Sequence, residues 1–99
     1  MSRIAILDYD VHEGDGTHYI FDNHKDVLFI SVHRHDRGTY YPSGPGGNFP
    51  NCGKGEAEGT KLNIPLNTVN KKRKSYDFQA PGDNEYIYLY NRIIHPILR

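Results

Sequence analysis

The sequence predicts an α/β fold built on a parallel sheet. Two runs, residues 4–7 and 27–32, are apolar on both faces, a pattern typical of parallel strands that are covered by helices. The connection between them, residues 11–26, is long enough for the crossover that parallel strands require. Near the carboxyl end, apolar side chains recur with the period of an amphipathic helix over residues 83–98.

The first half of the chain predicts a strand, a helix and a second strand. The first strand covers residues 3–9 and is expected to be buried on both faces. Gly14 and Gly16 end it, and a short helix over residues 15–23 follows. We expect this helix to carry three neighbouring apolar side chains inward: Tyr19, Ile20 and Phe21. The second strand then covers residues 27–32.

Residues 33–60 predict a long loop. They contain seven glycines together with Pro42 and Pro45, and loops of such length in compact domains are usually functional. A third, shorter strand covers residues 61–65 and is closed by Pro65.

The last third combines an insertion with a helix. Residues 67–81 are polar and indicate a surface insertion. Their basic run, Lys71-Lys72-Arg73-Lys74, is interpreted as a solvated surface run, with a nuclear import signal as the alternative. In the helix over 83–98, Asp83 is expected to act as the cap and Pro96 to produce a kink.

Composition excludes several classes of function. Ninety-nine residues make one small domain at most. Twelve basic and twelve acidic side chains balance, so no net field attracts nucleic acid or an acidic membrane. The sequence has no apolar run of membrane-spanning length, and its first residues lead us to expect no secretory leader. Cys52 is the single cysteine, so no internal disulfide is expected.

The segment Asp8–Gly16 carries the densest chemistry. Four carboxylates and an imidazole follow directly on the first apolar run. In an extended strand Asp8, Asp10 and His12 would project on one side, where two carboxylates and an imidazole suit a divalent metal such as zinc. Because ligands bind beyond the carboxyl ends of parallel strands, we expect this cluster to neighbour residues 31–33 at the end of the second strand.

A structural alternative exists for these acids. Asp15 could cap the following helix, and Asp8 or Asp10 could simply end a strand in solvent. Burying several carboxylates without a cation is costly, however, and this favours a metal or catalytic role.

Residues 6–17 also resemble the zinc-binding signature of the histone deacetylase family, whose usual form is Asp-x-Asp-Val-His-His-Gly-Asp/Asn-Gly-Thr. The resemblance continues through five further segments: residues 27–34, 38–44, 53–55, 62–66 and 93–97. The stretch Arg34-x-Asp36-x-Gly38-Thr39 is more similar to the class II branch than to class I. The resemblance implies the three-layer arginase/deacetylase fold with a parallel sheet, of which residues 1–99 are expected to form an incomplete segment, a partial domain.

Site residues follow from the resemblance only at matching positions. Asp10 and His12 would be two of three zinc ligands, and Asp8 and Asp15 would be catalytic residues of the second shell that orient histidines. Tyr41 would line the substrate channel. A structural potassium ion would be held by five residues: Asp8, Asp10, His12, Ser31 and Val32.

The resemblance implies zinc-dependent hydrolysis of an acetyl-lysine amide in a histone or another protein, in the nucleus or the cytoplasm or both. No motif here matches the family's paired histidines, third zinc ligand or oxyanion tyrosine, and Glu13 replaces the usual second histidine of the signature. We therefore expect this chain alone to be inactive. Its expected partners are the remainder of the deacetylase domain or co-repressor proteins. Two alternatives are a non-catalytic interaction module and an acetylpolyamine amidohydrolase.

Overall fold

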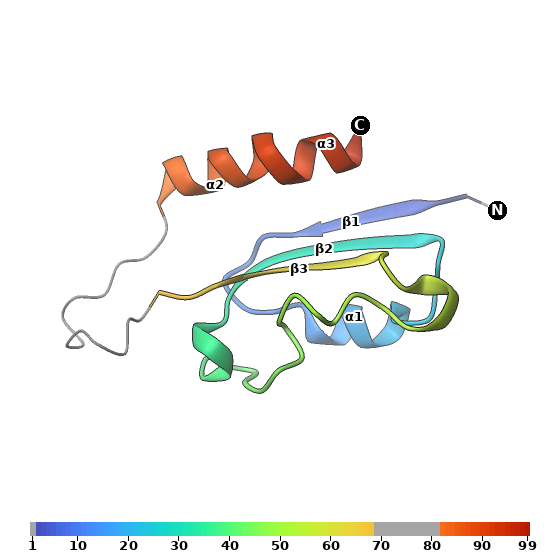
Figure 1. Ribbon diagram of the computed structural model, residues 1–99, viewed down its shortest axis with the longest axis horizontal. Helices are drawn as coiled ribbons and strands as arrows, with labels where there is room; N and C mark the ends of the chain where they lie inside the picture. The colour runs from blue at the N-terminus through green and yellow to red at the C-terminus, as the bar shows by residue number, and fades with distance from the viewer. Residues whose placement is uncertain (1, 69–81) are drawn as a thin grey trace. The chain divides into compact units, whose positions relative to one another are not determined.

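The computed structural model describes residues 2–68 and 82–99 of the chain (Figure 1). The chain divides into two compact units, residues 1–67 and 68–99, which are described separately below. The basic run Lys71–Lys74 and most of the predicted insertion lie outside the described residues. No helix in the described ranges has the length and apolar character needed to cross a membrane.

The first unit is a three-stranded parallel sheet in the order β1-β2-β3. The strands are β1 (Ile4–Asp8), β2 (Val27–Arg34) and β3 (Lys61–Leu66). Helix α1 (Asp15–Phe21) connects β1 to β2 and lies on the same side of the sheet as the loop between β2 and β3 (Figure 1). The predicted parallel α/β arrangement is therefore confirmed.

The core is centred on β2, the middle strand. Phe29, Ile30 and Val32 are almost completely buried. The prediction that the first strand is buried on both faces is wrong, because β1 is an edge strand of this sheet and Ile4 is 57% exposed. Both β1 and β2 have a continuous apolar sequence. Of the two, only β2, which pairs with a strand on each side, is buried by the described residues.

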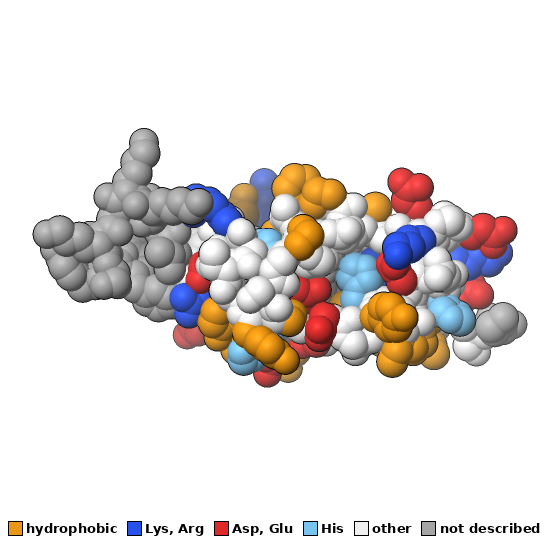
Figure 2. Space-filling view, turned by 90° about the horizontal axis from the view of Figure 1, so that it is seen from below, with side chains coloured by type: hydrophobic (Ala, Val, Ile, Leu, Met, Phe, Trp, Pro, Cys, Tyr) orange, Lys and Arg blue, Asp and Glu red, His pale blue; other side chains and the backbone are white. Residues whose placement is uncertain are grey.

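Helix α1 does not carry the three predicted side chains inward. Tyr19 is 85% exposed and Ile20 is 63% exposed, and Phe21 is only partly buried. At about 100° per residue, three consecutive side chains cannot share one helix face. His18 is the buried residue of α1 and packs edge-on against Phe29, with 6.1 Å between ring centroids. Exposed apolar side chains remain visible among polar ones on this side of the molecule (Figure 2).

Two strands are longer than predicted. β2 continues through His33 to Arg34, and β3 continues past Pro65 to Leu66. Pro65 lies opposite His33 in the register. A proline is tolerated there because β3 is an edge strand of this sheet, where a missing N–H need not remove a bond to a neighbour.

The second unit contains the predicted helix, in three consecutive segments. These are α2 (Asp83–Leu89), the π-helical turn η4 (Tyr90–Ile94) and α3 (His95–Leu98). The wider π turn directly precedes Pro96, whose ring nitrogen has no hydrogen to donate to the preceding turn. Asp83 is the first helical residue rather than the cap. The cap position is Gly82, whose N–H donates to the Glu85 carboxylate at 2.9 Å.

Lys61 joins β3 to the turn before β2. Its side chain is 1% exposed, and its ammonium donates to the carbonyls of His24 (3.1 Å) and Val27 (2.8 Å) and to the Thr60 hydroxyl (2.6 Å). Burial lowers the pKa of Lys61, while the nearby Asp22 carboxylate opposes that shift. Three acceptors match the three hydrogens of an ammonium group, so the buried nitrogen of Lys61 is fully hydrogen-bonded.

We predict that Lys61→Ala lowers the free energy of unfolding by roughly 2–4 kcal/mol, because it removes a buried stem and leaves three oxygens without this donor. Lys61→Met should cost about 1–2 kcal/mol, since methionine keeps most of the packing. Urea unfolding followed by circular dichroism measures both values. Lys25→Ala is the matched control, as the Lys25 side chain is 61% exposed. Equal stabilities for the Lys25 and Lys61 variants would contradict the assigned role.

A candidate metal site at the carboxyl end of the first strand

The chain leaves the extended conformation directly after Asp8. The Asp8 carboxylate accepts a hydrogen bond from the Asp10 N–H at 3.0 Å, and the Asp10 carboxylate accepts one from the His12 N–H at 2.9 Å. Such short-range bonds compete with sheet pairing and turn the chain. The expectation of an extended strand that projects Asp8, Asp10 and His12 on one side is therefore wrong, and two consecutive Asx turns replace it.

These turns bring the two predicted zinc ligands together. The His12 Nδ1 atom lies 3.5 Å from Asp10 Oδ1. Tetrahedral ligands that are each about 2.0–2.1 Å from a zinc ion lie about 3.3 Å from each other, so this pair has the chemistry and spacing of adjacent ligands. No group of three candidate metal-ligating side chains occurs within residues 2–68 and 82–99. Asp10 and His12 alone would not complete a zinc site, and zinc binding by this pair stays a prediction.

The His12 imidazole is bounded by two tyrosines. The Tyr40 ring stacks on it, with 5.2 Å between centroids and 6° between the planes. The Tyr41 ring meets it edge-on, with centroids 6.0 Å apart and an interplanar angle of 81°. Tyr41 is 73% exposed, so the predicted channel residue lies beside the candidate ligand with much of its surface open to solvent.

The second strand ends next to this cluster, as predicted. Asp8 pairs with Ser31 in the register of β1 and β2. The Ser31 hydroxyl lies 2.8 Å from His33 Nδ1, and both side chains are fully buried. The set predicted for potassium, in which Val32 would contribute its carbonyl, thus gathers residues from the adjoining ends of two paired strands; potassium binding there stays a prediction.

Gly14 permits a close approach at this edge. A Cβ atom at this position would lie 2.6 Å from Asp8 Oδ2 and 2.8 Å from the Phe29 ring. Either distance is too short for carbon, so any other residue at this position would require the Asp8 carboxylate and the Phe29 ring to shift. Gly14 also occupies the N-cap position of α1, with Asp15 as the first helical residue. The alternative in which Asp15 is the cap is therefore wrong.

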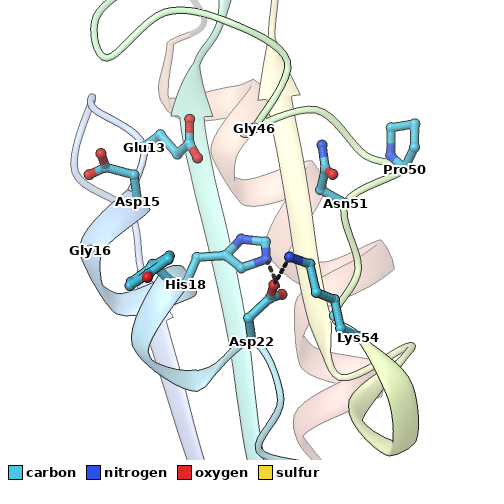
Figure 3. A pocket seen from close by; sticks show the side chains of 11 residues that line it. Glu13, Asp15, Gly16, His18, Asp22, Gly46, Pro50, Asn51 and Lys54 are labelled. Carbon is cyan, nitrogen blue, oxygen red and sulfur yellow. Dashed lines mark hydrogen bonds and ion pairs between the residues drawn. The ribbon is translucent and has the colours of Figure 1, made fainter.

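A separate cleft of about 580 Å³ lies between α1 and the loop that follows Gly46 (Figure 3). Glu13 and Asp15 lie at one end of it, and Asp22 lies between His18 and Lys54 (Figure 3). Asp22 Oδ1 lies 3.2 Å from His18 Nε2, and Asp22 Oδ2 lies 3.4 Å from Lys54 Nζ. Asp10 and His12 do not line this cleft, so the candidate metal ligands and the cleft are distinct features.

Two titratable groups near the strand ends are perturbed. Burial, assisted by the neighbouring Asp15 carboxylate, raises the pKa of Glu13. Burial lowers the pKa of His33 most strongly; His35 and His18 lower it further, whereas the Gly47 carbonyl and Asp8 raise it. His33 Nε2 donates to the Gly47 carbonyl at 2.7 Å, so in the neutral ring Nδ1 accepts a hydrogen bond from the Ser31 hydroxyl.

Sequence reasoning missed Tyr40 and Arg34 as parts of this region, whereas His33 lies at the strand end where residues 31–33 were expected. The guanidinium of Arg34 lies over the Tyr40 ring, 4.3 Å from its centroid. The adjacent pair Tyr40-Tyr41 in the glycine-rich loop was a usable signal. No sequence signal indicated which of the two would stack on His12 and which would meet it edge-on.

Comparison with known proteins identifies what this chain is similar to. Residues 1–99 match the family described as "Histone deacetylase domain". The chain is 40% identical over 95 residues to histone deacetylase 6 of Caenorhabditis elegans, covering 96% of the chain and 9% of that relative. It is 35% identical over 99 residues to histone deacetylase 18 of Arabidopsis thaliana, covering 100% and 13%. The chain therefore spans about a tenth of the length of these curated relatives.

Solved structures agree. The histone deacetylase Clr3 superposes with a TM-score of 0.82 at 34% identity, covering 97% of this chain and 14% of that chain. The HD domain of HDA15 superposes with a TM-score of 0.80, also at 34% identity, covering 97% and 24%.

We predict that His33 makes the fold sensitive to mild acid. Its pKa in the folded chain lies below the ordinary 6.5, so the unfolded chain takes up the proton first as the pH falls. Stability is full above pH 6.5 and is lost below it, by at most about 1.4 kcal/mol per pH unit for one proton. Glu13, with its raised pKa, acts in the opposite direction, so variants must be compared with each other.

The measurement is the free energy of unfolding in urea between pH 7.5 and 5.5. His33→Gln should show a shallower loss than the parent chain, because glutamine can still donate to the Gly47 carbonyl but does not titrate. His24→Gln, at an exposed histidine, should retain the parent slope. The same slope in the His33 variant and the parent would contradict the prediction.

Proposed function

This chain belongs to the histone deacetylase family, and we propose that it forms part of a zinc-dependent enzyme that hydrolyses acetylated lysine side chains. The observation that carries the proposal is the donor pair Asp10 and His12, 3.5 Å apart at the carboxyl end of β1, with an exposed tyrosine beside it. Ligand sites of parallel sheets lie at this end of the strands.

The residues have separate proposed roles. Asp10 and His12 would hold zinc, which when bound supplies a Lewis acid for the acetyl carbonyl and lowers the pKa of a bound water. Asp8 and Asp15 would each orient a histidine of the active site. Tyr41 would form one wall of the channel for the acetyl-lysine chain, its flat ring suited to the apolar part of that side chain. The Tyr41 hydroxyl adds a hydrogen-bonding group that a phenylalanine would lack.

A structural potassium ion is proposed for the adjoining strand ends. Asp8 and Ser31 are register partners there, and carboxylate, hydroxyl and carbonyl oxygens are the ligands that hard cations prefer. The proposed substrate is an acetylated lysine of a histone or another protein, in the nucleus or cytoplasm. Contacts with the remainder of a deacetylase domain or with co-repressors belong to the same proposal.

We predict that Asp10→Ala and His12→Ala each weaken zinc binding at least about 10-fold, because each removes one of two proposed ligands. Competition with a chromogenic chelator measures the affinity. Glu56→Ala is the control, since the Glu56 side chain is 85% exposed. Equal affinities in the three variants would place zinc elsewhere on the chain and contradict the ligand assignment.

We predict no turnover of a fluorogenic acetyl-lysine peptide by the 99-residue chain in the presence of zinc. Two protein ligands are fewer than the three of catalytic zinc sites, and the family's histidine base and oxyanion tyrosine have no match in the sequence. Turnover that disappears in Asp10→Ala would overturn this prediction and show a complete site.

A further inference from the structure

The ring of His12, one of the two proposed zinc ligands, contacts the rings of Tyr40 and Tyr41. Its side chain is 48% exposed and lies in the turn after β1, so its own backbone does not fix the ring. An imidazole bound to a metal must have its nitrogen directed at the ion, and neighbouring groups that contact the ligand normally fix this orientation. Here the Tyr40 ring stacks on the face of His12, and the Arg34 guanidinium lies over Tyr40.

The Tyr40 ring is parallel to the imidazole within 6°, and the Tyr41 ring stands at 81° to it. One tyrosine therefore contacts the face of His12 and the other meets it edge-on. With the ring plane defined in this way, Nδ1 lies 3.5 Å from the Asp10 carboxylate, the other proposed ligand. Tyr41 remains 73% exposed, so orientation of the ligand depends on Tyr40 while Tyr41 stays accessible to a substrate.

Tyr40 is itself anchored to the end of β2. The Arg34 guanidinium lies 4.3 Å from the Tyr40 centroid, and its Nε donates to the Asp36 carboxylate at 2.5 Å. The Asp36 side chain is only 5% exposed, so this ion pair is shielded from solvent on the acid side. The Arg34 backbone N–H also donates to the Val11 carbonyl at 2.9 Å, next to His12. One residue of β2 thus fixes both the turn and, through Tyr40, the ring.

The backbone of the intervening turn is strained. Asp36 and Arg37 both have positive φ values, 49° and 56°, although neither is glycine. Such conformations cost roughly 1–3 kcal/mol each and persist where surrounding contacts impose them, often at functional sites. This strained turn precedes Tyr40, whose N–H donates to the His35 carbonyl at 3.3 Å.

We propose that Tyr40, supported by Arg34 and Asp36, is a positioning residue that holds the His12 imidazole in the orientation needed to bind a divalent metal. This inference rests on the proposed function, because it assumes that His12 is a ligand. It assigns a role to Tyr40, which is not itself a ligand. Tyr40 would orient the metal ligand His12, and Tyr41 would contact the substrate.

The test compares Tyr40→Leu with Tyr40→Phe. Phenylalanine keeps the stacked ring and removes only the hydroxyl, whereas leucine removes the stack. Tyr19→Leu controls for the loss of an exposed tyrosine elsewhere. Cobalt(II) serves as a spectroscopic substitute for zinc, and its affinity is measured by titration. Tyr40→Leu should weaken cobalt binding about 10-fold, as loss of an orienting neighbour typically does, with Tyr40→Phe and Tyr19→Leu within about twofold of the parent.

A second readout uses no metal. Stacking on Tyr40 shifts the His12 ring proton resonances upfield, and this shift should persist in Tyr40→Phe and disappear in Tyr40→Leu. Melting temperatures of the metal-free variants separate loss of orientation from loss of fold. Unchanged cobalt affinity in a folded Tyr40→Leu chain that has lost the upfield shift would overturn the proposal. So would an equal loss of affinity in Tyr40→Phe, since that would assign the effect to the hydroxyl.

These experiments distinguish failure of the positioning role from failure of the proposed function. If His12→Ala leaves the cobalt affinity of the parent unchanged, the ligand assignment and the positioning role both fall, whatever the ring resonances show. If His12→Ala weakens binding but Tyr40→Leu does not, only the positioning role falls.

Discussion

Two buried polar side chains on neighbouring strands impose order on the loop beside the candidate site. His33 of β2 donates to the Gly47 carbonyl, and the amide nitrogen of Asn63 on β3 lies 3.1–3.3 Å from the carbonyls of Gly46, Asn48 and Asn51. Both side chains are at most 2% exposed, and a buried donor without an acceptor costs about 1–3 kcal/mol. The glycine-rich segment therefore folds over the sheet with its carbonyls turned toward the buried nitrogens of His33 and Asn63, while Asn63 Oδ1 is left without a hydrogen-bond partner among the described residues.

The same constraint organises the residues around it. With the loop fixed, Gly14 can bring the start of α1 against Asp8, and Glu13 lies partly buried, where burial raises its pKa. The Asx turns at Asp8 and Asp10 then direct the chain toward the end of β2, where the Arg34 N–H binds the Val11 carbonyl. The candidate metal ligands are thus held by backbone hydrogen bonds on one side and by aromatic contacts on the other.

Much of the fold could be predicted from local pattern. The apolar runs at 4–7 and 27–32 determined two parallel strands, and the helical period over 83–98 determined a helix of that extent. Burial was predicted less well, because apolar sequence does not show which strand is central: Ile4 lies on an edge and Ile30 in the middle. The prediction that Tyr19 and Ile20 point inward was wrong for a related reason. Only one face of a helix packs against the sheet, and consecutive residues lie on different faces.

The spacing Asp8-x-Asp10-x-His12 is a property of the sequence, and by itself it determined which side chains could act as metal ligands and at which end of the strand they lie. Only the tertiary structure decided how they are oriented. Tyr40 lies 28 positions from His12 in the chain, and the Arg34 guanidinium lies over Tyr40. The stacking of Tyr40 on His12 depends on the register of β1 with β2 and on a strained turn. Local sequence does not encode such long-range packing, because it arises only when separate segments meet in the folded sheet.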